Sequence, residues 1–79
     1  GFEIGQLVKF IPCASHHNDE DNNYTWGVKH IIGRVKSRNK STVSVIEVSR
    51  RSHSSDVEQS TRAGTRWRML PSHDEILDE

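Results

Sequence analysis

The apolar residues of this chain are gathered in four short segments, within which they tend to alternate with polar residues. The segments cover residues 4–11, 26–37, 41–49 and 65–70, and they contain many β-branched and aromatic side chains. Alternation with a period of two places every second side chain on the same face of a strand. β-branched and aromatic residues also favour strands. The chain is therefore predicted to be all-β.

The alternation also identifies the core. Apolar residues are 32% of the 79 in the chain, so we expect a small core of about ten side chains. The residues predicted to point inward are Ile4, Val8, Phe10, Ile31, Gly33, Val35, Val43, Val45, Trp67 and Met69. Residues 37–40 are predicted to form a tight turn between the second and third strands, in which Asn39 tolerates a left-handed backbone.

Polar stretches separate the strands of what we expect to be a single domain of residues 1–79. Residues 13–25 and 49–64 are predicted to be long loops. The second contains a Ser-Asp-Val-Glu sequence at 55–58 with the spacing of a capping box, which allows one short helical turn before Gly64. A second capping-box sequence near the end of the chain predicts a terminal 3₁₀ or α turn within 71–77.

Four or five short antiparallel strands in so small a domain favour closure into a barrel, because closure removes exposed sheet edges. The sequences Ile-Gly-Gln-Leu-Val-Lys-Phe at 4–10, Ile-Gly-Arg-Val at 32–35 with the hairpin to 45, and Arg-Trp-Arg-Met-Leu-Pro at 66–71 resemble small SH3-like barrels of the KOW and Tudor kind. They are similar in particular to the barrel that follows the protease part of some SprT-like proteins. The resemblance implies a five-stranded barrel used to bind RNA, DNA or protein tails.

Charge is distributed unevenly along the chain, although the total is zero. Residues 27–68 carry ten Lys and Arg side chains against three acidic ones, a balance of +7. Residues 1–26 carry one Lys and four acidic side chains, a balance of −3. Residues 69–79 carry four acidic side chains and no Lys or Arg, a balance of −4. A domain of this length has a radius of gyration of roughly 12 Å, whereas physiological salt screens charge over about 8 Å. Opposite blocks on different sides would therefore not cancel at a contact surface.

The cationic block suggests a surface for nucleic acid. Simple alternation places three cations on one face of the second strand and two on one face of the fourth, and others lie in the turn and the second loop. Cations spaced along a face suit a phosphate backbone, and six such contacts would lower affinity about a thousandfold between low and moderate salt. The candidate nucleic-acid-binding residues are Arg34, Lys36, Arg38, Lys40, Arg50, Arg51, Arg66 and Arg68. The competing interpretation is a solvated outer face whose long side chains cover apolar surface.

Other kinds of site find less support. Tyr24, Trp26 and Trp67 have the composition of a cage for a methylated cation, but in a chain with few large residues the tryptophans are expected to fill the core. The His and Asp residues at 16–21 lack the spacing of a structural metal site. No nucleophile elbow and no His-Glu-x-x-His motif is present. We therefore expect a noncatalytic binding module without cofactor or metal.

The partner class has one alternative. If the basic face does not bind RNA or DNA, the domain is expected to be a protein-interaction module, as a monomer or a small homo-oligomer formed through Leu7, Ile11 and Ile46. The single cysteine, Cys13, excludes an internal disulfide and fits a reducing compartment. No apolar run is long enough to cross a bilayer, so no membrane partner is expected, and the expected location is cytoplasmic.

Overall fold

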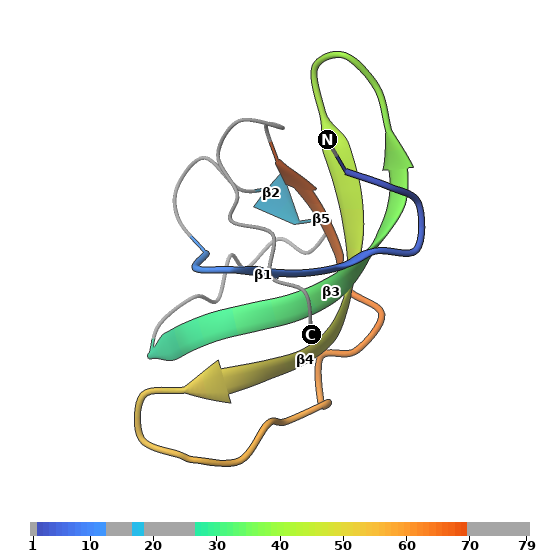
Figure 1. Ribbon diagram of the computed structural model, residues 1–79. Coiled ribbons are helices and arrows are strands. Elements are labelled where there is room, and N and C mark those ends of the chain that lie inside the picture. The colour runs from blue at the N-terminus through green and yellow to red at the C-terminus, as the bar shows by residue number, and fades with distance from the viewer. Residues whose placement is uncertain (1, 13–16, 19–26, 70–79) are drawn as a thin grey trace.

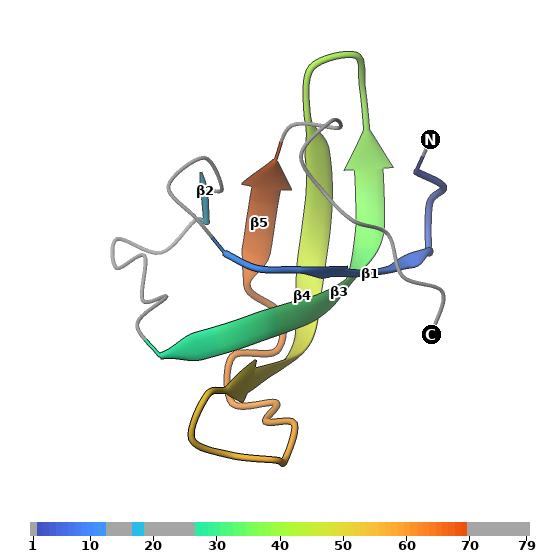
Figure 2. The same ribbon diagram turned by 60° about the vertical axis from the view of Figure 1, so that its left-hand side comes forward.

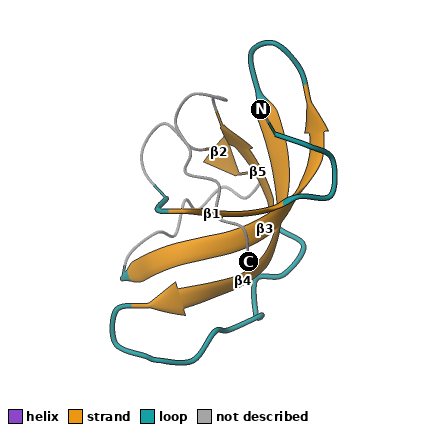
Figure 3. Ribbon diagram, viewed as in Figure 1, coloured by secondary structure: helices purple, strands orange, loops and turns teal. Residues whose placement is uncertain are grey.

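The computed structural model describes residues 2–12, 17–18 and 27–69. These residues form one antiparallel sheet with the strand order β1-β3-β4-β5-β2 (Figure 1). The strands are β1 (Leu7–Phe10), β2 (His17–Asn18), β3 (Val28–Arg38), β4 (Val43–Ser52) and β5 (Arg66–Met69). The described residues include no helix (Figure 3). The predicted all-β class is therefore confirmed.

The first strand is shorter than the sequence predicted. Gly5 has a φ of 87°, which turns the chain before β1 begins. Within this turn the Gln6 side-chain oxygen accepts a hydrogen bond from the Glu3 amide at 2.9 Å. Ile4 consequently lies outside the strand and is 62% exposed, so its assignment to the core was wrong. Phe2, which the alternation did not identify, is buried instead.

The remaining core prediction is confirmed. Apart from Ile4, every residue predicted to point inward is buried, Gly33 included. Trp67 is fully buried and packs edge-on against Phe10, with their ring centroids 5.6 Å apart. This contact joins β1 to β5, which are not neighbours in the sheet. The apolar side chains of the core are Phe2, Val8, Phe10, Ile31, Val35, Val43, Val45, Trp67 and Met69.

Three β-bulges shift the pairing of β3 with β4. The register steps from Val28 to His30, from Ile32 to Gly33 and from Val35 to Ser37, which leaves Lys29 and Lys36 of β3 and Val48 of β4 as the extra residues. Bulges bend a strand and increase its twist, and both long strands curve strongly together (Figure 2). Each bulge also moves the following residues to the opposite face, because side chains alternate along a strand.

The bulge at Val48 places an ion pair inside the sheet. Before the bulge, Glu47 pairs with Gly33 on the inward face, and after it Arg50 pairs with Ile31 on the same face. The Arg50 guanidinium donates from Nε to Glu47 Oε2 and from Nη2 to Glu47 Oε1, both at 2.8 Å. The indole Nε1 of Trp67 donates to the same Oε1 at 3.0 Å. Glu47 is only 1% exposed, and these three bonds satisfy its carboxylate.

The predicted hairpin between β3 and β4 is confirmed, but Asn39 acts differently from the prediction. Among the described residues no residue other than glycine has a positive φ, so Asn39 does not adopt the left-handed backbone. Its side-chain oxygen instead accepts hydrogen bonds from the amides of Ser41 at 2.8 Å and Thr42 at 2.7 Å. An asparagine in this role stabilises a turn by replacing a backbone acceptor.

The loop predictions need correction where the residues are described. β2 lies inside the expected loop 13–25, and β4 continues to Ser52, so the second loop begins at residue 53. This loop is fixed to β4 by a bridge in which the Arg50 amide donates to Gln59 O at 2.8 Å and the Gln59 amide donates to Arg50 O at 2.7 Å. It contains turns but no helix. The predicted terminal turn lies outside the described residues.

The buried ion pair generates a prediction about stability. Glu47→Gln removes the charge but keeps an oxygen that can accept from Trp67, so it isolates the pair with Arg50. Because a buried cation that loses its partner is costly, the free energy of unfolding should fall by about 3 kcal/mol, as measured by urea denaturation. The matched control is Glu58→Gln, which removes a carboxylate from a side chain that is 32% exposed and should cost less than about 1 kcal/mol. Equal losses in the two variants would contradict the role given to Glu47.

The turn generates a second prediction. Asn39→Ala leaves the amides of Ser41 and Thr42 without their side-chain acceptor and should lower the free energy of unfolding by about 1 kcal/mol. Asn39→Asp keeps an acceptor oxygen and should retain most of the stability, measured in the same denaturation series. If Asn39→Asp is as unstable as Asn39→Ala, the side-chain hydrogen bonds do not hold this turn.

Candidate nucleic-acid interface

Two exposed arginines flank an isoleucine on the outer face of the sheet. Arg34 of β3 pairs with Ile46 of β4, and Ile46 pairs in turn with Arg66 of β5. Residues paired directly across antiparallel strands place their side chains on the same face. The Arg34 and Arg66 backbones are two strand spacings apart, or roughly 10 Å. Leu7 of β1, which pairs with Arg34, completes this row.

A third arginine lies in the neighbouring row. Arg68 follows Arg66 by two residues on β5, so it lies on the same face roughly 7 Å further along the strand. It pairs with Ser44 of β4 and is exposed, as are Arg34 and Arg66. We call Arg34, Arg66 and Arg68, together with Ser44 and Ile46 between them, the basic face. The sequence predicted all three of its arginines.

A bulge near the hairpin end of β3 separates Lys36 and Arg38 from this face. Lys36 is the extra residue of a bulge, and Arg38, beyond it, pairs with the buried Val43. The bulge therefore moves Arg38 off the face of Arg34, where simple alternation had placed it. Arg38 donates a hydrogen bond to the carbonyl oxygen of Phe2. Lys40 is exposed in the turn itself.

Arg50 is not part of an exposed surface. Its side chain is 13% exposed and forms the buried pair with Glu47. The sequence placed Arg50 in a flexible loop because β4 was expected to end at Ser49, whereas the strand runs on to Ser52. A signal was present in the sequence: Glu47 continues the inward alternation of Val43 and Val45, and a buried charge requires a partner of opposite sign.

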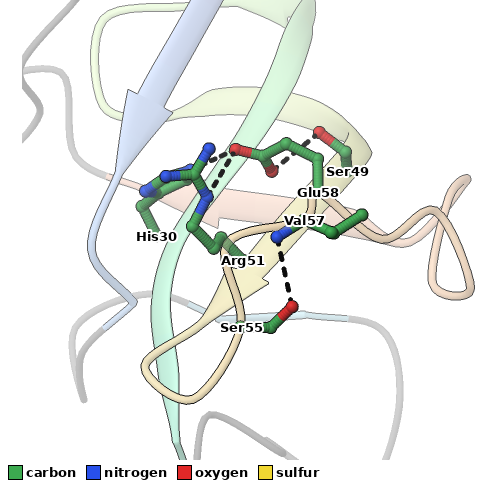
Figure 4. Close-up of polar contacts among 6 residues, drawn as sticks. All are labelled: His30, Ser49, Arg51, Ser55, Val57 and Glu58. Carbon is green, nitrogen blue, oxygen red and sulfur yellow. Dashed lines mark hydrogen bonds and ion pairs between the residues drawn. The ribbon is translucent and has the colours of Figure 1, made fainter.

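Arg51 lies on the outer face but is paired with a carboxylate. Arg51 pairs with His30 across β3 and β4, and both side chains contact Glu58 from the loop after β4 (Figure 4). His30 Nε2 is 2.7 Å from Glu58 Oε1, and Arg51 Nε is 3.4 Å from the same oxygen. Ser49 Oγ lies 3.4 Å from Glu58 Oε2. We call these four residues the Glu58 cluster.

The described residues favour neither of the other kinds of site. Trp67 is fully buried, so it cannot line an exposed aromatic cage, and Tyr24 and Trp26 lie outside the described residues. Within residues 2–12, 17–18 and 27–69 no group of three or more His, Cys, Asp or Glu side chains is arranged to hold a metal ion. The same part of the chain includes no helix of the length and apolarity that a membrane span requires.

Comparison of the chain with protein-family models, with curated proteins and with solved structures finds no match. A guanidinium offers a planar set of donors that fits two phosphate oxygens at once. Serine hydroxyls and aliphatic side chains between the arginines can contact sugar and backbone but cannot stack on bases. These side chains can contact the phosphate backbone of a polyanion.

Proposed function

We propose that this domain binds the phosphate backbone of RNA or DNA through the basic face. The observation that carries the proposal is the row in which Arg34 and Arg66 flank Ile46, with Arg68 on the same face in the next row. Three arginines with exposed side chains share this face, and their backbones lie roughly 7 to 12 Å apart. They make a surface whose attraction for phosphates salt only partly screens.

We further infer that the sheet belongs to an SH3-like barrel of the KOW or Tudor kind. The two edge strands of the sheet, β1 and β2, are consecutive in the chain and separated by residues 11–16. A connection this short between the two edges favours a sheet that curls round on itself. Strong curvature of β3 and β4 (Figure 2) supports the same inference. This fold presents strand faces to partners of several classes, so it does not by itself select nucleic acid.

Binding through this face should depend little on base sequence. Sequence is read by contacts with base edges, whereas phosphate contacts only position the protein. The basic face offers phosphate donors without an aromatic side chain among its members. We expect duplexes of different sequence to bind with similar affinity.

The proposal predicts a specific salt dependence. If the three arginines of the basic face each meet one phosphate, the logarithm of the association constant should fall with the logarithm of salt concentration with a slope of about −2.7 on duplex DNA. Affinity should then decrease roughly 40-fold between 50 and 200 mM salt. Fluorescence anisotropy with labelled duplex DNA and duplex RNA measures both quantities.

A pair of double variants locates the surface. Arg34→Gln with Arg66→Gln should make the slope less negative by about 1.8 and leave the melting temperature nearly unchanged, because both side chains are exposed. Lys29→Gln with Lys40→Gln removes the same charge from exposed positions outside the basic face and should retain most of the slope. If the salt slope becomes less negative by the same amount in both double variants, the attraction depends on net charge alone. No binding to either duplex at 50 mM salt would refute the proposal and favour a protein partner, detected by nuclease-resistant association.

A further inference from the structure

Three hydrogen-bond donors on the outer face of the sheet converge on one carboxylate. His30 comes from β3, and Ser49 and Arg51 come from β4, while Glu58 comes from the loop that follows β4. Figure 4 shows the Glu58 carboxylate between the three donors. The donors are therefore fixed by the pairing of the two longest strands, whereas the acceptor is supplied from outside the sheet.

The Glu58 carboxylate does not form a short hydrogen bond with each of the three donors. Only the contact with His30, at 2.7 Å, is short, and the contacts with Ser49 and Arg51 are both 3.4 Å. The Nε atom of Arg51 is enclosed, and it has no hydrogen-bond partner in the described part of the chain. A buried donor without an acceptor is unfavourable. A carboxylate holds its two oxygens in one plane, whereas the oxygens of a phosphate group point to the corners of a tetrahedron and can meet donors that do not share a plane.

We propose that Glu58 is a placeholder in an oxyanion site formed by His30, Ser49 and Arg51, and that a phosphate group replaces its carboxylate. The assignment of that phosphate to a nucleic-acid backbone rests on the proposed function. In the occupied state the guanidinium of Arg51, the imidazole Nε2 of His30 and the hydroxyl of Ser49 donate to phosphate oxygens. The displaced carboxylate then turns to solvent, so Glu58 opposes polyanion binding in the free protein.

The site continues the basic face along the same strands. His30, Ile32 and Arg34 alternate along β3 without an extra residue between them, so all three lie on the outer face. Four residues of strand place His30 roughly 13 Å from Arg34. On β4 the bulge at Val48 brings Ser49 opposite Ile32 and Arg51 opposite His30. One backbone lying across the basic face can therefore reach this site as an additional contact.

Displacement requires movement of one side chain and leaves the loop in place. The neighbouring residue, Gln59, is held to Arg50 by two backbone hydrogen bonds. Glu58 itself is partly exposed, with a side-chain accessibility of 32%, so its carboxylate can rotate into solvent. The ion pairs that it loses are partly buried, with side-chain exposures of 10% for His30 and 32% for Arg51, and the incoming phosphate takes over the same donors.

Inorganic phosphate is the direct probe of the site. In nuclear magnetic resonance titrations of the wild-type chain and of Glu58→Gln, phosphate should shift the signals of His30, Ser49 and Arg51. Affinity should rise about two- to fivefold in Glu58→Gln, which is the range expected when a partly exposed ion pair no longer competes. Glu58→Ala removes the competing side chain altogether and should bind phosphate at least as tightly as Glu58→Gln.

Asp56→Asn is the matched control, because Asp56 is exposed in the same loop and the substitution changes net charge equally. Its phosphate affinity should stay close to that of the wild-type chain. The inference is overturned if Glu58→Gln and Asp56→Asn gain equally, or if the phosphate-dependent shifts lie away from the three donors.

Anisotropy with the mixed-sequence duplex separates this inference from the proposed function. Because its carboxylate no longer competes with the backbone phosphate, Glu58→Gln should bind the duplex about two- to fivefold more tightly than Asp56→Asn at low salt. If both variants bind the duplex equally, the role proposed for Glu58 is wrong, whereas the proposed binding through the basic face is unaffected. If phosphate binds at the three donors but no form of the protein binds a duplex, the site stands and the nucleic-acid proposal is wrong.

Discussion

The buried carboxylate of Glu47 constrains how the strands of the sheet can pair, because its hydrogen-bond donors must lie on the same inward face. It accepts three hydrogen bonds, two from Arg50 and one from Trp67, and so connects the end of β4 to the centre of β5. Desolvation of such a pair offsets much of its attraction, so we do not regard it as the main source of stability. Its effect is on register. Glu47 and Arg50 lie on the same strand, and the bulge at Val48 keeps both on the inward face. A slip of one residue in β5 would turn Trp67 to the other face and leave the buried carboxylate without one of its three donors.

The β-bulges then decide which cations can act together. The bulge at Val48 sends Arg50 inward and Arg51 outward, and the bulge at Lys36 removes Arg38 from the face of Arg34. Within the described residues, the pairing thus sorts the cations into separate environments and keeps Arg34, Arg66 and Arg68 on one face. The same sorting brings the donors of the Glu58 cluster into line with the basic face. Core formation and the proposed binding surface therefore depend on the same irregularities of pairing.

Much of the fold could be predicted because hydrophobic alternation reports directly on burial. Val43 with Val45, and Trp67 with Met69, are buried as this pattern predicted. The pattern fails where a single residue changes its phase, and nothing in the local sequence marks Lys36 or Val48 as extra residues. Arg66 and Arg68 were placed correctly because β5 has no bulge in its pairing with β4. The partnership of Arg51 with Glu58 depends on how a loop returns to the sheet, which sequence alone does not reveal.

The most direct test of the central claim is to map the backbone amides whose chemical shifts change when the isotope-labelled domain is titrated with a mixed-sequence duplex at low salt. We expect the largest changes at Arg34, Ile46, Arg66 and Arg68, which adjoin one another across three strands, and smaller ones at the turn of the β3–β4 hairpin. Changes concentrated in that turn, or no changes on β5, would contradict the account.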